Sequence, residues 1–61
     1  MKIEFMKPHK LGGIQFDTGH QLEINNDVVF ETMNDKYYLL IFNGLRYDIL
    51  KEDIKVIEND F

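Results

Sequence analysis

The chain has 61 residues, a formal net charge of −4 and no cysteine, which predicts one small domain, residues 1–61, without a disulfide to support its core. No apolar run approaches the roughly 20 residues that cross a bilayer, and Lys2 and Glu4 interrupt the opening stretch where a signal peptide would be apolar. We therefore expect a cytoplasmic domain without a membrane partner.

The composition favours strands over helices. Alanine, the best helix former, is absent, whereas β-branched and aromatic residues are plentiful. The charge is uneven, because residues 1–15 carry three lysines against one glutamate and residues 16–35 carry five acidic residues with no lysine or arginine. We interpret the acidic stretch as a solvated surface; the alternatives are an acidic face for a basic partner and a nucleic-acid mimic.

The first 19 residues predict a strand followed by a long irregular loop. Residues 2–6 alternate between apolar and charged side chains, as a short strand does, and Pro8 ends that strand. Within the 7–19 loop, Pro8 and the paired glycines indicate irregular backbone. Its apolar residues nevertheless predict a loop packed against the core: Leu11, Ile14 and Phe16.

The middle of the chain predicts four further strands separated by tight turns. Asn43-Gly44 is a strong signal for a two-residue type I′ hairpin. The expected strands are residues 20–24, 28–33, 36–42 and 45–49. Residues 50–58 allow two interpretations, a helical turn at 51–53 followed by a short strand, or one C-terminal helix; β-branched Val56 and Ile57 favour the turn and strand.

The hairpin fixes the register of the two strands that it joins. Counting outward from Asn43-Gly44 places six apolar side chains on one face, in the pairs Phe42–Leu45, Leu40–Tyr47 and Tyr38–Ile49. The preceding hairpin must match this face. A two-residue loop would turn Glu31 into the core, at the cost of burying a carboxylate. We therefore predict a three-residue loop, 34–36, with a bulge, which adds Val28 and Phe30 to the apolar face.

The same register leaves apolar side chains on the opposite face, where a half-buried antiparallel strand is normally polar. The 7–19 loop covers part of this second face, or the face is exposed without a role, or it meets a partner. The candidate partner-binding residues are Val29, Tyr37, Leu39 and Ile41, with Arg46 and Asp48 at the rim.

The order of these elements resembles the SH3-like barrel. Residues 16–24, FDTGHQLEI, look like the end of its long first loop and the start of its second strand. Residues 47–57, YDILKEDIKVI, look like its last long strand, helical turn and closing strand. The resemblance implies an all-β, SH3-like small barrel of five to six short antiparallel strands with one helical turn near the C-terminus. The tryptophan and the helical-turn proline of polyproline-binding members are missing.

The opening residues carry a second resemblance. Residues 1–13, MKIEFMKPHKLGG, are similar to the start of small uncharacterised phage and prophage proteins. This resemblance implies a phage accessory or assembly component.

The residues offer little for catalysis. Serine and cysteine are absent, which leaves Thr18 and Thr32 as isolated hydroxyl groups. His9, His20 and Asp17 form the one metal-ligand set to consider, and we interpret both histidines as packing or surface residues instead. We therefore expect no enzyme, no cofactor and no metal.

These observations predict a non-enzymatic protein–protein interaction module whose partner is another protein or a second copy of the chain. The alternative is a small nucleic-acid-binding β-barrel. Lys7, His9 and Lys10 would then contact phosphates, and Tyr37 and Tyr38 would stack on bases. The acidic total disfavours this alternative, because a phosphate backbone is bound by lysine and arginine.

Overall fold

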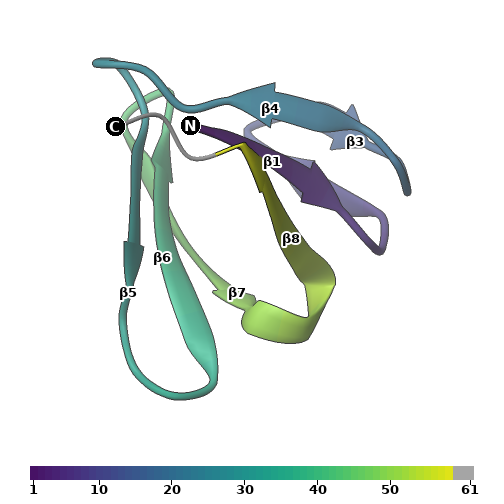
Figure 1. Cartoon of the computed structure of the whole chain (residues 1–61). Helices are drawn as coiled ribbons and strands as arrows, with labels where there is room; N and C mark the ends of the chain where they lie inside the picture. Colours follow the sequence, from purple (N-terminus) through teal and green to yellow (C-terminus); the bar gives the residue numbers. More distant parts are fainter. Residues whose placement is uncertain (59–61) are drawn as a thin grey trace.

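The computed structural model describes residues 1–58 and confirms an all-β fold (Figure 1). Three small antiparallel sheets have the strand orders β4-β1-β8, β2-β3 and β5-β6-β7. The elements are β1 (Lys2–Phe5), β2 (His9–Leu11), β3 (Ile14–Phe16), β4 (Gln21–Glu23), β5 (Val29–Thr32), β6 (Tyr37–Phe42), β7 (Leu45–Leu50), the 3-10 turn η1 (Lys51–Asp53) and β8 (Ile54–Glu58). No helix within residues 1–58 has the length and apolar character needed to cross a bilayer.

The 7–19 segment differs from the expected irregular loop, because it contains the β2–β3 hairpin. Gly12 and Gly13 both have positive φ, 57° and 84°, which is the backbone of a type I′ turn. Leu11 therefore pairs directly with Ile14. This hairpin supplies the two strands beyond the expected six. Leu11 and Phe16 are buried as predicted, whereas Ile14, beside the turn at the tip of the hairpin, is 44% exposed.

The sheet β5-β6-β7 has the predicted register. Across the β6–β7 hairpin the pairs are Phe42–Leu45, Leu40–Tyr47 and Tyr38–Ile49. Asn43 and Gly44 at its turn both have positive φ. On the other side of β6, Phe30 pairs with Leu40, which requires the three-residue loop and leaves Glu31 exposed.

Side-chain hydrogen bonds close the 34–36 loop. The Asn34 Oδ1 atom accepts the backbone N–H groups of Lys36 and Tyr37, both at 2.9 Å. The N–H groups of Met33 and Asn34 both donate to the Tyr37 carbonyl, at 3.1 and 3.3 Å. Two residues thus oppose one, which is the arrangement of the predicted β-bulge.

The C-terminal segment follows the turn-and-strand interpretation. After η1, β8 pairs with β1, and the register shifts between Lys2–Glu58 and Ile3–Val56. Ile57 is the extra residue at this shift, and both Val56 and Ile57 are exposed. No ladder within residues 1–58 joins the three sheets into one closed sheet, so barrel closure stays a prediction.

The core lies between the sheets and includes side chains from all three. The Phe5 and Phe16 rings lie 4.8 Å apart, and Phe16 meets Phe42 edge-on at 5.6 Å. The 7–19 segment therefore packs against the inner face of β6. The buried apolar residues are Ile3, Phe5, Leu11, Phe16, Leu40, Ile49 and Ile54.

Candidate functional site

The candidate partner-binding residues lie together on one face of the β5-β6-β7 sheet. Ile41 pairs with Val29 on one side and with Arg46 on the other, and Leu39 pairs with Asp48. Tyr37 follows on the same face of β6, because side chains alternate along a strand. We call this the outer face, made of Val29, Glu31, Tyr37, Leu39, Ile41, Arg46, Asp48 and Leu50.

No strand of the described chain covers the outer face. In Figure 1, β1, β4, β8 and the β2–β3 hairpin all lie on the other side of the β5-β6-β7 sheet. Val29 is 38% exposed, and Tyr37, Leu39 and Ile41 are half-buried. None of these four side chains belongs to the core or to the apolar residues packed against it. An apolar stripe three residues long therefore remains in contact with solvent on β6.

Charged side chains flank the apolar stripe on both neighbouring strands. On β7, Arg46 Nε lies 3.3 Å from Asp48 Oδ1, and both side chains are at least half exposed. On β5, Glu31 stands opposite Leu39. The stripe thus has a mixed-charge border on the β7 side and an acidic residue on the β5 side, which is the layout of an apolar interface core with a polar rim.

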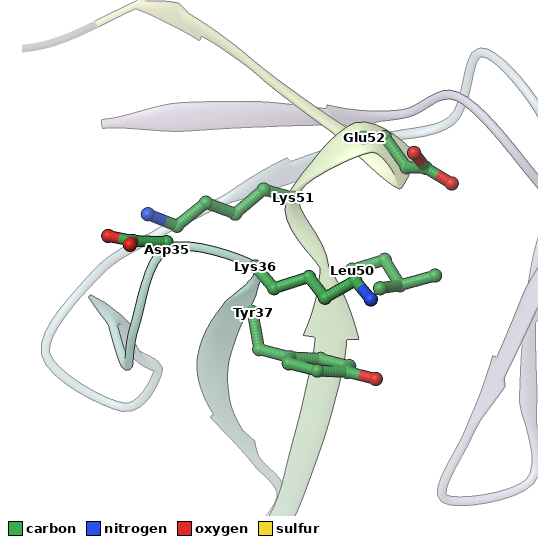
Figure 2. Close-up of a pocket in the computed structure, with 6 residues that line it drawn as sticks. All are labelled: Asp35, Lys36, Tyr37, Leu50, Lys51 and Glu52. Carbon is green, nitrogen blue, oxygen red and sulfur yellow. The ribbon is translucent and has the colours of Figure 1, made fainter.

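Two outer-face residues, Leu50 and Glu31, were not among the predicted contact residues. Leu50 pairs with Tyr37, and extending the count from the Asn43-Gly44 turn by one more pair would have found it. With Leu50 the stripe continues into a pocket at the end of the sheet. Its lining side chains come from the 34–36 loop, β6, β7 and η1 (Figure 2): Asp35, Lys36, Tyr37, Leu50, Lys51 and Glu52.

The two tyrosines proposed to stack on bases lie on opposite faces of β6. Tyr37 is on the outer face, whereas Tyr38 faces inward, where its ring lies 4.5 Å from that of Phe30. The Lys51 ammonium lies 5.4 Å from the centre of the Tyr38 ring, in a cation–π contact. Tyr37 and Tyr38 therefore do not form one stacking platform.

A second polar cluster surrounds Asp53, a buried carboxylate at the end of η1. Its Oδ2 lies 3.1 Å from His9 Nε2, and its Oδ1 lies 3.4 Å from Lys7 Nζ. The Lys7 contact is ionic rather than an aligned hydrogen bond, because Oδ1 has no hydrogen-bond partner within the described residues. Lys7 also lies 3.7 Å from Glu52. The cluster connects the segment after β1 to η1.

The two histidines do not meet in a metal site. His9 contacts Asp53 rather than Asp17, and His20 packs edge-on against Phe16 at 4.8 Å. Among residues 1–58, no three histidine, cysteine or acidic side chains come close enough to hold a metal ion.

Comparison of the chain with models of protein families, with curated proteins and with solved structures found no match.

Proposed function

We propose that this chain is a non-enzymatic protein–protein interaction module that binds its partner through the outer face. One observation carries the proposal: Tyr37, Leu39 and Ile41 form an apolar stripe that is neither in the core nor packed against it. Exposed apolar patches with a polar rim mark interaction sites on soluble domains. The register also brings Arg46 and Asp48 to the border of that stripe.

The chemistry of the outer face describes the partner surface. Apolar side chains of the partner would cover Leu39 and Ile41, and the Tyr37 ring would add area at one end. The ion pair of Arg46 with Asp48 would set the orientation, because rim charges contribute to specificity more than to affinity. The partner surface is therefore apolar at its centre and carries both signs of charge at its edge.

The order of elements supports an SH3-like barrel as the setting of this function. Such a barrel would contain two sheets with the strand orders β4-β1-β8 and β5-β6-β7. It would also contain the β2–β3 hairpin in the segment that connects β1 to β4, and η1 before β8. The resemblance of residues 1–13 to small phage and prophage proteins makes a phage accessory or assembly component our proposal for the biological role.

Nucleic-acid binding ranks second. Lys7, one of the three residues expected to contact phosphates, already contacts Glu52 and Asp53. The tyrosines lie on opposite faces of β6, and the total charge is −4. Titration of labelled single- and double-stranded DNA and RNA at low salt tests this alternative. Binding that weakens steeply as salt is raised would favour it over the outer-face proposal.

The outer-face proposal is tested by immobilising the wild-type protein and the Leu39→Glu and Ile41→Lys variants, and comparing the proteins that each retains from a cell extract. We expect one or more proteins to bind the wild type and to be lost from both variants, followed by direct binding of the purified partner in calorimetry. Thr32→Gln, an exposed change on β5, is the matched control and retains the partner. If folded Leu39→Glu and Ile41→Lys retain every partner of the wild type, the proposal is wrong.

A further inference from the structure

The β5-β6-β7 sheet ends at β7 with an edge that no strand within residues 1–58 pairs. A free strand edge carries unpaired backbone N–H and C=O groups and is a template for another strand. The hairpin register determines which residues of β7 direct these backbone groups away from the sheet, and those residues decide what kind of strand can pair with the edge.

The outward-directed backbone groups belong to Arg46, Asp48 and Leu50. A two-residue hairpin closes with a hydrogen-bonded pair, here Phe42 and Leu45. Hydrogen bonding to β6 then alternates along β7. The Lys51 N–H confirms this parity, because it donates to the Lys36 carbonyl, toward the β6 side, at 2.9 Å. The intervening even-numbered residues therefore direct their N–H and C=O groups away from β6.

The side chains beside these groups complement a second copy of the same strand. When β7 meets another β7 antiparallel, with Tyr47 at the two-fold axis, Arg46 of each copy stands opposite Asp48 of the other. Both residues direct their backbone groups outward, so these are the hydrogen-bonded pairs of the new ladder. Two opposite-charge pairs form on the outer face by symmetry, in addition to the contact of Arg46 with Asp48 within each copy.

The same edge also exposes an apolar side chain on the inner face of the sheet. Leu45 is 53% exposed, the largest value among the exposed large apolar side chains of the described chain. In the Tyr47-centred register, Leu45 stands opposite Ile49 of the second copy. The backbone groups, the charges and the apolar side chain thus agree on one register.

We propose that two copies of this chain associate through antiparallel pairing of their β7 edges, with Arg46 of each copy opposite Asp48 of the other. The product is a six-stranded sheet with the order β5-β6-β7-β7-β6-β5. The two outer faces then lie side by side on one surface. This pairing needs no partner on Tyr37, Leu39 and Ile41, although it shares Arg46 and Asp48 with the border of the outer face.

Charge exchange tests the register. Asp48→Lys places two basic side chains opposite each other at both positions, and Arg46→Glu does the same with acidic ones. We expect each variant to raise the dimer dissociation constant by about tenfold or more. A mixture of the two variants restores both opposite-charge pairs, so it forms a heterodimer of Asp48→Lys with Arg46→Glu. Glu31→Lys, in the same row but on the other edge strand, is the matched control and dimerises like the wild type.

Analytical ultracentrifugation up to about 1 mM protein measures these constants, because a strand-edge contact is smaller than the interfaces of tight complexes. Circular dichroism establishes that each variant folds. In the wild type, the amide protons of Arg46 and Asp48 should exchange more slowly as protein concentration rises. This measurement requires no variant, so it tests the proposal even if the variants do not fold. A wild type that stays monomeric at 1 mM overturns the proposal. A dimer that both single variants leave unchanged, or a mixture that gives no heterodimer, also overturns it.

Discussion

His9 Nε2 lies 3.1 Å from Asp53 Oδ2, so residues 44 positions apart in the chain hold β2 against η1. The backbone adds a second link here, since the Met6 N–H donates to the Asp53 carbonyl at 2.7 Å. The Asp53 side chain is only 8% exposed, and its Oδ1 has Lys7 as its ionic partner. A buried carboxylate has lost its hydration, so Asp53 stabilises the fold only while its contacts with His9 and Lys7 remain.

Asp53→Asn should therefore lower the free energy of unfolding by about 1–2 kcal/mol. The amide keeps the shape of the carboxylate and can still bond to His9, but it loses the ionic contact with Lys7. Urea unfolding followed by circular dichroism measures the change. Glu52→Gln is the matched control, since Glu52 is 70% exposed at 3.7 Å from the same lysine, and an exposed pair contributes about 0.5 kcal/mol or less. Equal effects of the two variants would contradict a special role for Asp53.

Gly44→Ala should destabilise the protein by about 1 kcal/mol, because Gly44 has a φ of 77°, which alanine adopts with strain. Asn43→Gly, at a φ of 52°, is the control at the other turn position and should change stability by less than about 0.5 kcal/mol, since glycine accepts that backbone. Thermal unfolding distinguishes them. A Gly44→Ala variant as stable as the wild type would mean that the turn does not require its type I′ backbone.

Asn34→Ala should cost about 1 kcal/mol, because the Asn34 Oδ1 accepts both the Lys36 and the Tyr37 backbone N–H. The exposed neighbour Asp35 provides the control, Asp35→Ala. Proton exchange at Tyr37 gives a local measurement, since the variant should accelerate exchange of this amide more than that of Leu40 in the middle of the strand. Unchanged exchange at Tyr37 would show that the loop holds its shape without the side-chain bonds.

The register of the β5-β6-β7 sheet was predictable because two independent constraints agree on it. Asn43-Gly44 fixes one hairpin, and the requirement to keep Glu31 out of the core fixes the other. Both are local or nearly local in sequence. The same reasoning brought Tyr37, Leu39 and Ile41 to one face, which the structure leaves outside the core.

The β2–β3 hairpin was missed although its signal is equally local. Gly12-Gly13 favours the same type I′ turn as Asn43-Gly44, but the paired glycines were interpreted, together with Pro8, as irregular backbone. The contact of His9 with Asp53 had no local signal at all. It depends on how β2 meets η1 in space, and a pattern of single residues does not encode that distance.

Leu40 and Leu39 are neighbours on β6 that test the two faces directly. Leu40 is 0% exposed, so Leu40→Ala removes buried methyl groups and leaves a cavity, at a cost of about 2–5 kcal/mol. That is comparable to the whole stability of a domain of this size, and we expect the variant to be largely unfolded at 37 °C. Leu39 is half-buried on the outer face, so Leu39→Ala should cost about 1 kcal/mol or less and leave a cooperative urea transition. The two variants remove the same atoms from adjacent positions, and the difference between their midpoints therefore reports burial alone. If Leu39→Ala proves as destabilising as Leu40→Ala, then the outer face is covered by the chain or by a second copy in solution.

Urea unfolding of Leu39→Ala at several protein concentrations separates those two cases, because only covering by a second copy makes the midpoint depend on concentration.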